Sequence, residues 1–158
     1  MLETTGFRRY VIRPTLGPIS IWSVAIENLL IGTGLAESYM SALRQYGGGS
    51  AIGLFQMEST TYDSLWHDYL DYRPNLRARV LRFAAGPIIP PEADQMAWNL
   101  ALATVMARIK YMTIPEPLPD ANDIEELASY WKRHYNTAGG KGKPEEFVNR
   151  YQLFGGHK

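Results

Sequence analysis

The sequence of 158 residues lacks cysteine and net charge, with sixteen basic residues balanced by sixteen acidic ones. The absence of cysteine excludes disulfide bridges and thiolate metal sites. The balanced charge argues against bulk nucleic acid or an anionic membrane surface as a partner. The histidines His67, His134 and His157 do not have the spacing of metal ligands. We therefore expect neither a metal nor a cofactor.

The chain also lacks a long uninterrupted apolar run. Residues 19–36 form the longest apolar stretch, but Glu27 and Asn28 lie in its middle, which predicts a buried helix rather than a membrane span. The first fifteen residues have no apolar segment before a small-residue cleavage site, so we expect no signal peptide. If the protein acts outside the cytoplasm, another component is expected to deliver it.

What the chain does contain is enough apolar residues for one core, at 46% hydrophobic and 12% aromatic. Glycine and proline separate helix-sized runs, so the sequence predicts a mostly helical single domain. Only the glycine loop around residues 47–49 and the stretch 9–13 suit an extended chain. The four tryptophans recur about once per predicted helix, which favours core packing. Helices are expected over residues 18–37, 61–70, 75–84, 94–112, 123–136 and 144–154.

Several positions mark where these helices begin. Pro18 and Pro144 suit a first helical turn, because a missing N–H costs little there. Thr60 is a candidate N-cap, and Asn122 opens a capping-box pattern. The segment 94–112 is apolar on nearly all sides, which predicts a helix in the middle of the core.

Glu37 is the first residue to suggest chemistry. It ends an apolar helix, and partial burial there would raise the pKa of its carboxyl group and keep a proton available near neutral pH. A general acid needs that property to protonate a glycosidic oxygen. Glu37 could equally be the first solvated residue after a core helix, and spacing alone leaves both interpretations open. Gly32 and Gly34 nearby predict that a large group approaches the helix backbone closely.

Three ordered segments carry a resemblance to a known family: GLAES at 34–38, GLFQME at 53–58 and HYNTAGGKG at 134–142. They resemble the motifs of the soluble-lytic-transglycosylase-type domain, in which Glu-Ser ends a helix, Gly-Leu-Met-Gln follows a loop, and Tyr-Asn-Ala-Gly lies toward the C-terminus. The similarity covers about residues 20–142. The chain departs from the family pattern at Phe55 for Met, Glu58 for Pro, His134 for a small residue, and the inserted Thr137.

The resemblance implies a mostly α, single-domain lysozyme-like fold over residues 1–158, with a central buried helix and little β structure. It implies a lytic transglycosylase that cleaves the β-1,4 bond between N-acetylmuramic acid and N-acetylglucosamine in peptidoglycan. Glu37 would first protonate the leaving oxygen. It would then act as base toward the muramic C6 hydroxyl, which closes a 1,6-anhydro ring without water.

The same resemblance assigns the remaining site residues. Tyr135 would join Glu37 as a catalytic residue by orienting its carboxyl group, although a core aromatic residue is an alternative. Substrate-binding roles fall to Ser38, Gly53, Leu54, Phe55, Gln56 and Asn136. Phe55 would lie on the wall of the cleft. The alternatives are a helix-end hydroxyl for Ser38, loop hydrogen bonding for Gln56 and a helix C-cap for Asn136.

Two other functions stay open. A hydrolytic muramidase would need a second carboxylate, for which Glu58 or Asp63 is the candidate, against a simple helix-dipole role. An inactive glycan-binding or structural virion protein is the alternative of another class. Segments such as MARIKYM also resemble virion-associated or lytic proteins of tailed bacteriophages. The expected location is the virion or the cytoplasm of the producing cell, with action on the cell wall in the periplasm. The expected partners are peptidoglycan glycan strands and other virion proteins.

Overall fold

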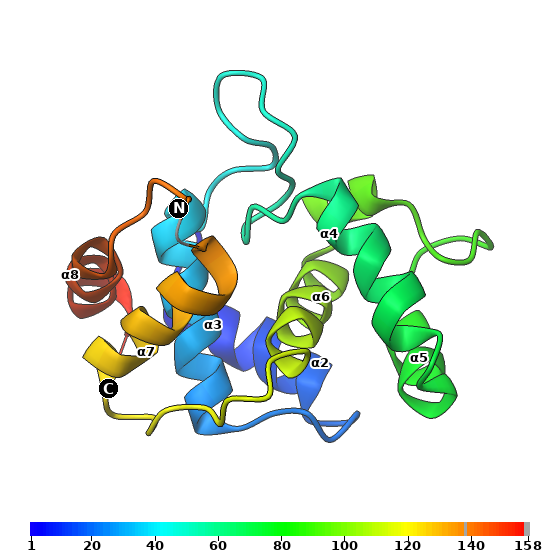
Figure 1. Cartoon of the computed structure of the whole chain (residues 1–158), viewed down its shortest axis with the longest axis horizontal. Coiled ribbons are helices and arrows are strands. Elements are labelled where there is room, and N and C mark those ends of the chain that lie inside the picture. The colour runs from blue at the N-terminus through cyan, green and yellow to red at the C-terminus, as the bar shows by residue number, and fades with distance from the viewer. Residues whose placement is uncertain (138, 157–158) are drawn as a thin grey trace.

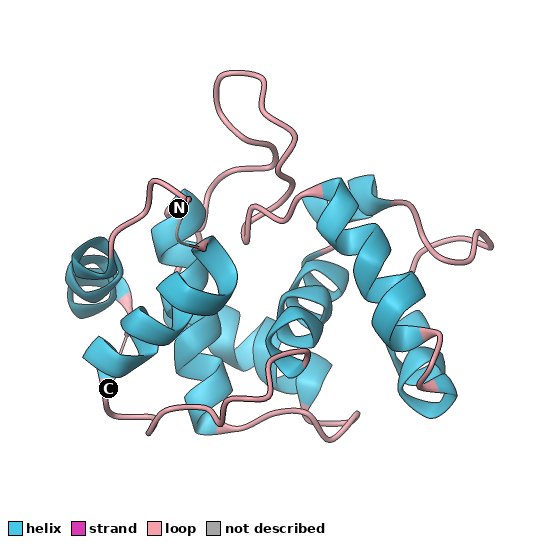
Figure 2. Cartoon of the chain, viewed as in Figure 1, coloured by secondary structure: helices cyan, strands magenta, loops and turns pink. Residues whose placement is uncertain are grey.

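The computed structural model describes residues 1–137 and 139–156, and helices dominate it (Figures 1 and 2). Within these residues no strand forms. Extended pairing is limited to isolated antiparallel bridges that join Arg44 to Ile52 and Ile52 to Met57. One cluster of buried apolar side chains runs through the chain, from Phe7 to Tyr151. The prediction of a mostly helical single domain with little β structure is therefore confirmed.

The N-terminal segment forms one continuous helix, built from α1 (Thr4–Phe7), the π-helical η1 (Arg8–Ile12) and α2 (Arg13–Leu16). The carboxylate of Glu3 caps it by accepting hydrogen bonds from the backbone N–H groups of Thr5 and Gly6. Phe7, Ile12 and Leu16 are buried. The expectation of extended chain at residues 9–13 was wrong, because this cap and the buried helical face outweigh the β-branched residues of that stretch.

The first long helix, α3 (Val24–Ser38), begins later than predicted. Ser23 caps it by accepting a hydrogen bond from the backbone N–H of Ile26 at 3.2 Å. Pro18 instead lies in the turn after α2, a common place for proline because it cannot continue a helix. A Cβ on Gly32 would lie 1.9 Å from the ring of Phe147, so this glycine allows α8 (Pro144–Phe154) to approach α3 closely, as predicted.

A buried ion-pair network joins the N-terminal helix to α3. Glu27 accepts hydrogen bonds from Arg8 at 3.1 Å, from Arg13 at 2.8 and 2.9 Å, and from the indole of Trp22 at 2.7 Å. Burial alone would raise the pKa of Glu27, but these hydrogen bonds hold it below its usual range. Arg8 also donates to Asn28 at 2.7 Å. Both polar residues of the apolar stretch are thus satisfied inside the protein.

Four other helices begin within a few residues of the positions predicted from the sequence. The helix α4 (Ser59–Ser64) continues as the π-helical η2 (Leu65–Leu70) and begins directly after Glu58, so Thr60 lies inside it. It is followed by α5 (Pro74–Leu81). The helix α7 (Ile124–Trp131) is capped by Asp123, whose carboxylate accepts from the N–H of Glu126, and not by Asn122. Pro144 begins α8 as predicted.

The central helix is α6 (Leu100–Met112), preceded by the 3-10 turn η3 (Ala93–Ala97). The side chain of Asn99 caps it by accepting from the N–H of Leu102 at 3.0 Å. In Figure 1 α6 lies between α3 and α7 on one side and α4 and α5 on the other. Its side chains Leu102, Val105 and Met106 are fully buried. The prediction of a central buried helix is confirmed for residues 100–112, but the expected start at residue 94 was wrong, because residues 93–97 form the 3-10 turn and Asn99 caps the helix.

The tryptophans divide into two groups. Trp66 and Trp131 are buried in the core, whereas Trp98 is 62% exposed and Trp22 is 39% exposed, so core packing explains only half of them. Among residues 1–137 and 139–156, no helix has the length and apolar character needed to cross a membrane.

Candidate active site

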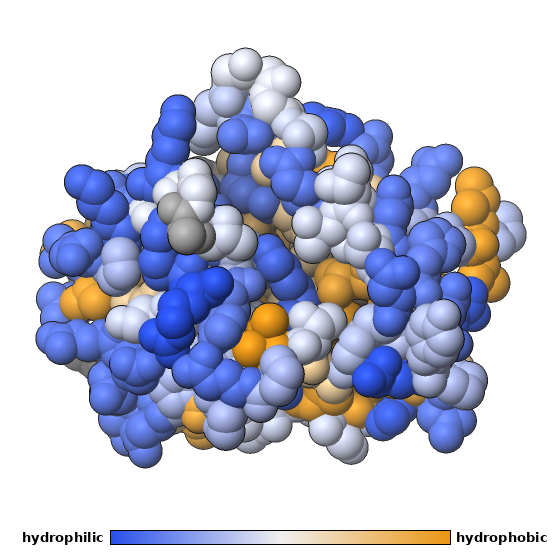
Figure 3. All heavy atoms as spheres, viewed as in Figure 1, coloured by the Kyte–Doolittle hydropathy of each residue, from blue (hydrophilic) through white to orange (hydrophobic). Residues whose placement is uncertain are grey.

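A cleft of about 760 Å³ lies beneath the loop that follows α3, and Figure 3 shows the surface hollowed there, near the centre of this face. The loop is the one that Figure 1 draws at the top. The helices α3, α4, α6 and α8, the C-terminal end of the α7 segment and this loop all contribute residues to the wall of the cleft. The lining residues are Ala36, Glu37, Gln45, Tyr46, Ala51, Gln56, Glu58, Thr61, Lys110, Tyr135, Asn136, Thr137, Gly139, Gly140, Lys141, Gly142 and Glu146.

Glu37 lies in the last turn of α3, half-buried at the cleft. Its Oε1 accepts a hydrogen bond from Nε1 of Trp131 at 3.0 Å and a longer one from Nδ2 of Asn136 at 3.4 Å. Within the described part of the chain, no hydrogen-bond donor reaches Oε2. One carboxylate oxygen is therefore held by the protein, and the other is left for a ligand.

Both donors come from one end of the α7 segment. Beyond Trp131 the helix continues as the π-helical η4 (Lys132–Asn136). The wider π turn brings residues five apart closer to the same side than an α-helix does. Trp131 and Asn136 are five apart, so both reach Glu37. Nζ of Lys132 donates to Oδ1 of Asn136 at 2.8 Å, which turns the Asn136 amide nitrogen toward Glu37.

The surroundings of Glu37 favour its protonated form. Burial raises the pKa of its carboxyl group above the usual range, and this outweighs four lowering influences. Those influences are the hydrogen bonds from Asn136 and Trp131 and the positive charges of Lys110 and Lys132. A carboxyl group with a raised pKa, positioned at a cleft, can donate a proton to a bound oxygen near neutral pH.

Lys110 projects from the central helix α6 into the same cleft. Its Nζ donates to the backbone carbonyl of Tyr135 at 2.9 Å and lies 3.7 Å from the centre of the Tyr135 ring. Burial lowers the pKa of Lys110 to about 8, although the charges of Glu37 and Glu58 oppose that shift. Sequence reasoning missed this residue. The available signal was a lysine within a helix predicted to lie in the core.

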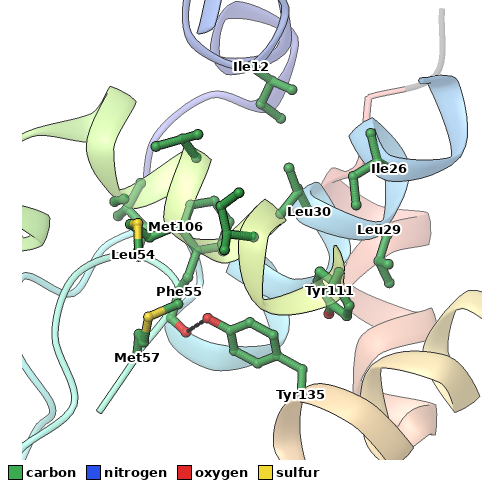
Figure 4. Close-up of a cluster of buried hydrophobic side chains, with 14 of the residues drawn as sticks. Ile12, Ile26, Leu29, Leu30, Leu54, Phe55, Met57, Met106, Tyr111 and Tyr135 are labelled. Carbon is green, nitrogen blue, oxygen red and sulfur yellow. Dashed lines mark hydrogen bonds between the residues drawn. The ribbon is translucent and has the colours of Figure 1, made fainter. Parts of the chain in front are cut away.

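Of the motif residues 53–56, Gln56 lines the cleft, whereas Gly53, Leu54 and Phe55 do not. Gly53 has a φ of +73°, and a Cβ there would lie 2.4 Å from the carbonyl oxygen of Met96. Leu54 and Phe55 are 4% and 2% exposed, so their side chains belong to the core (Figure 4). The expectation that Phe55 lines the cleft wall was wrong, because reciprocal backbone hydrogen bonds between Ile52 and Met57 close a tight turn directed inward.

Hydroxyl groups of the two other motifs hold this turn in place. Ser38 Oγ donates to the carbonyl of Leu54 at 2.8 Å. The Tyr135 hydroxyl donates to the carbonyl of Phe55 at 2.8 Å, the dashed line of Figure 4, and not to Glu37 as expected. The Tyr135 ring is buried against that of Tyr111, with ring centres 5.3 Å apart. The orienting groups of Glu37 are therefore Trp131 and Asn136, and the three motifs meet through backbone carbonyls.

Among the predicted polar contacts, Gln56 and Asn136 do line the cleft. The side chain of Gln56 donates back to the carbonyl of Gly53 at 2.8 Å, which matches the loop-bonding alternative. Ser38 is buried beneath the surface. Ala138 of the third motif and His157 lie outside the described residues.

The two candidate second carboxylates differ in position. Glu58 lines the cleft and accepts a hydrogen bond from the Ser50 hydroxyl. Asp63 is exposed on α4 and is not part of the cleft lining. Of these two candidates only Glu58 shares the cleft with Glu37, and Glu146 is a further acidic residue among the lining residues. In the described part of the chain, no group of three or more histidine or acidic side chains is arranged to hold a metal ion.

Comparisons of the chain with family models, with curated proteins and with solved structures give no match. The cleft and its residues are therefore the basis for assigning a function.

Proposed function

We propose that this protein is a peptidoglycan lytic transglycosylase with a lysozyme-like fold, and that Glu37 is its catalytic acid. The observation that carries the proposal is the state of Glu37 in the cleft. Its carboxyl group has a raised pKa, its Oε1 is held by Trp131 and Asn136, and its Oε2 accepts no hydrogen bond from the described residues. The order of the three sequence motifs supports the same reaction class.

In the proposed reaction, one carboxyl group serves two steps. Protonated Glu37 donates its proton to the glycosidic oxygen as the bond from that oxygen to C1 of the muramic residue breaks. The resulting carboxylate then takes the proton of the muramic C6 hydroxyl as that oxygen attacks C1. The products are a strand with a 1,6-anhydro end and a strand with a new free hydroxyl. No water is consumed.

Glu58 supports a second candidate, a hydrolytic muramidase, because it lies in the same cleft as Glu37. In that reaction a second carboxylate either attacks C1 or activates a water molecule. The transglycosylase is preferred because Glu58 is exposed and engaged with Ser50, whereas Glu37 is shielded and oriented. Asp63 does not line the cleft and is therefore not proposed as a second carboxylate.

The biological setting proposed with this reaction is that of a bacteriophage protein. It would act on the bacterial cell wall, either as a virion component at entry or as a lytic protein at release. Its partners would be peptidoglycan glycan strands and other virion proteins. The alternative from another class, an inactive glycan-binding or structural virion protein, is an outcome of the experiment below.

The test is mass spectrometry of muropeptides released from purified peptidoglycan by the wild type and by Glu37→Gln, Glu58→Gln and Asp63→Asn variants. We expect anhydro-muramic ends from the wild type, from Glu58→Gln and from Asp63→Asn, and none from Glu37→Gln. Reducing ends that disappear in Glu58→Gln would establish the muramidase instead. An absence of soluble products from the wild type would overturn both enzymatic proposals and leave the binding or structural protein.

A further inference from the structure

Lys110 is a cation at the cleft without an ion-pair partner. Among residues 1–137 and 139–156 its amine forms no salt bridge, although eight others occur there. Its one hydrogen bond goes to the neutral carbonyl of Tyr135 at 2.9 Å. An ammonium group has three donors, so two of them remain for a ligand. A partly buried charge without a counter-ion is costly, and such groups concentrate at binding sites.

The position of the amine is well defined. The Tyr135 ring lies 3.7 Å below Nζ, and that ring is fixed in turn by its hydroxyl bond to Phe55. Lys110 therefore presents a fixed positive charge at the cleft rather than a mobile surface charge. It belongs to the rigid central helix α6, whereas Lys141, which also lines the cleft, is exposed on a loop.

The sign of this charge limits what it can do in the reaction. Glycosidic cleavage develops positive charge on the sugar ring at C1, and a nearby cation opposes that development. Lys110 is therefore poorly suited to stabilise the transition state. It is well suited to bind a negative group of the substrate before the chemistry, because a charge-assisted hydrogen bond in a shielded cleft is strong.

We propose that Lys110 binds a carboxylate of the glycan strand and so restricts the cleft to strands that carry one next to the cleavage point. The inference rests on the proposed function, because it takes peptidoglycan as the substrate. Two chemical sources offer such a carboxylate: the lactyl group of muramic acid in strands without peptides, and the peptide stem in intact strands. A chitin oligosaccharide has the same sugar backbone and no carboxylate.

The experiment is calorimetric binding in the Glu37→Gln background, where no cleavage confuses the measurement. The probes are peptide-free glycan strands, peptide-bearing strands and chitohexaose. Adding Lys110→Met is expected to weaken binding of at least one carboxylate-bearing strand by about tenfold or more and to change chitohexaose binding by less than about twofold. The strand that loses affinity identifies the source of the carboxylate. Lys143→Met, an exposed lysine outside the cleft, removes the same charge as a control.

Unchanged binding of both carboxylate-bearing strands in Lys110→Met would overturn the inference. An equal loss for those strands and for chitohexaose would also overturn it, since that pattern means that Lys110 only supports the site around Tyr135. Lys110→Arg, which keeps the charge, should retain most of the discrimination. Failure of the proposed function is separate, because it appears as absent cleavage by the wild type, whatever the binding data show.

Discussion

The indole nitrogen of Trp131 donates a hydrogen bond to Oε1 of Glu37 at 3.0 Å, across 94 residues of sequence. The same tryptophan is buried and packs against the ring of Phe147, with ring centres 5.7 Å apart. One side chain thus belongs to the core by its ring and to the cleft by its N–H. The ionisation of Glu37 therefore depends on how α7 packs against α3.

Trp131→Phe should raise the pKa of Glu37 further, because the hydrogen bond from the indole stabilises the carboxylate and would be lost. A general acid works while protonated, so the alkaline limb of the pH–rate profile should move to higher pH. The carboxyl shift of Glu37, followed by NMR titration, checks the pKa independently of activity. A pKa that stays constant or falls would show that the indole does not stabilise the ionised form.

Gly53→Ala should destabilise the protein by at least about 3 kcal/mol, because it adds a backbone clash to a strained φ. The clash is with the Met96 carbonyl, 2.4 Å from the new Cβ. Gly47→Ala is the matched control, since Gly47 has a φ of +79° and nothing within 4 Å. It should cost only about 1–2 kcal/mol. Urea unfolding of both variants measures the difference, and equal costs would contradict the predicted clash.

Tyr135→Phe should lower the free energy of unfolding by about 1–3 kcal/mol, because it leaves the Phe55 carbonyl without its donor. Tyr72→Phe removes a hydroxyl from a side chain that is 78% exposed and should have almost no effect. Denaturant midpoints of the two variants provide the comparison. If Tyr135→Phe were as stable as the wild type but lost activity, the hydroxyl would have a direct catalytic role instead.

Glu27→Gln should cost about 3 kcal/mol, because it leaves Arg8 buried without a counter-charge. The pKa of Glu27 is lower in the folded state than in the unfolded state. Its contribution is therefore present above the unfolded value of about 4.5 and is lost as pH falls through the folded value. The stability gap between wild type and variant should narrow on acidification. A gap that is constant from neutral to acidic pH would refute the linkage.

Lys110 should also make stability rise with pH, but in an alkaline range and because burial disfavours its charged form. Its pKa falls from 10.5 to about 8 on folding, so the unfolded chain holds the proton more tightly between those values. The free energy of unfolding should then rise with pH from about 8 to 10.5, relative to the Lys110→Met variant. Chemical denaturation across that range measures it. Parallel curves for the two proteins would mean that Lys110 titrates normally.

Much of the fold could be predicted from local signals. The central helix follows from a segment that is apolar on nearly all sides, and the start of α8 follows from Pro144. The N-terminal helix was missed because its stability comes from the Glu3 cap and from contacts of Phe7, Ile12 and Leu16 that the isolated sequence does not reveal. The start at Pro18 was misplaced because a proline after a helix resembles one that opens a helix.

The site could be predicted less fully than the fold. Glu37 was found because helix ends and small residues are visible in sequence. Trp131 was not found, because it lies 94 residues away. Asn136 was predicted to bind substrate, but its bond to Glu37 was not predicted, because it depends on a π turn. The inward turn at Gly53 was missed for a similar reason. It depends on contacts with Leu43, Met96 and Tyr135, which no local pattern specifies.

The π turn at the end of α7 makes the site sensitive to chain length. Deleting Arg133 would leave every side chain that lines the cleft in the sequence, yet Trp131 and Asn136 would no longer share one oxygen of Glu37. Substitutions at the exposed Arg133 preserve that spacing, whereas a single-residue deletion there destroys it. In this segment the number of residues between Trp131 and Asn136 matters for function as much as their identity does.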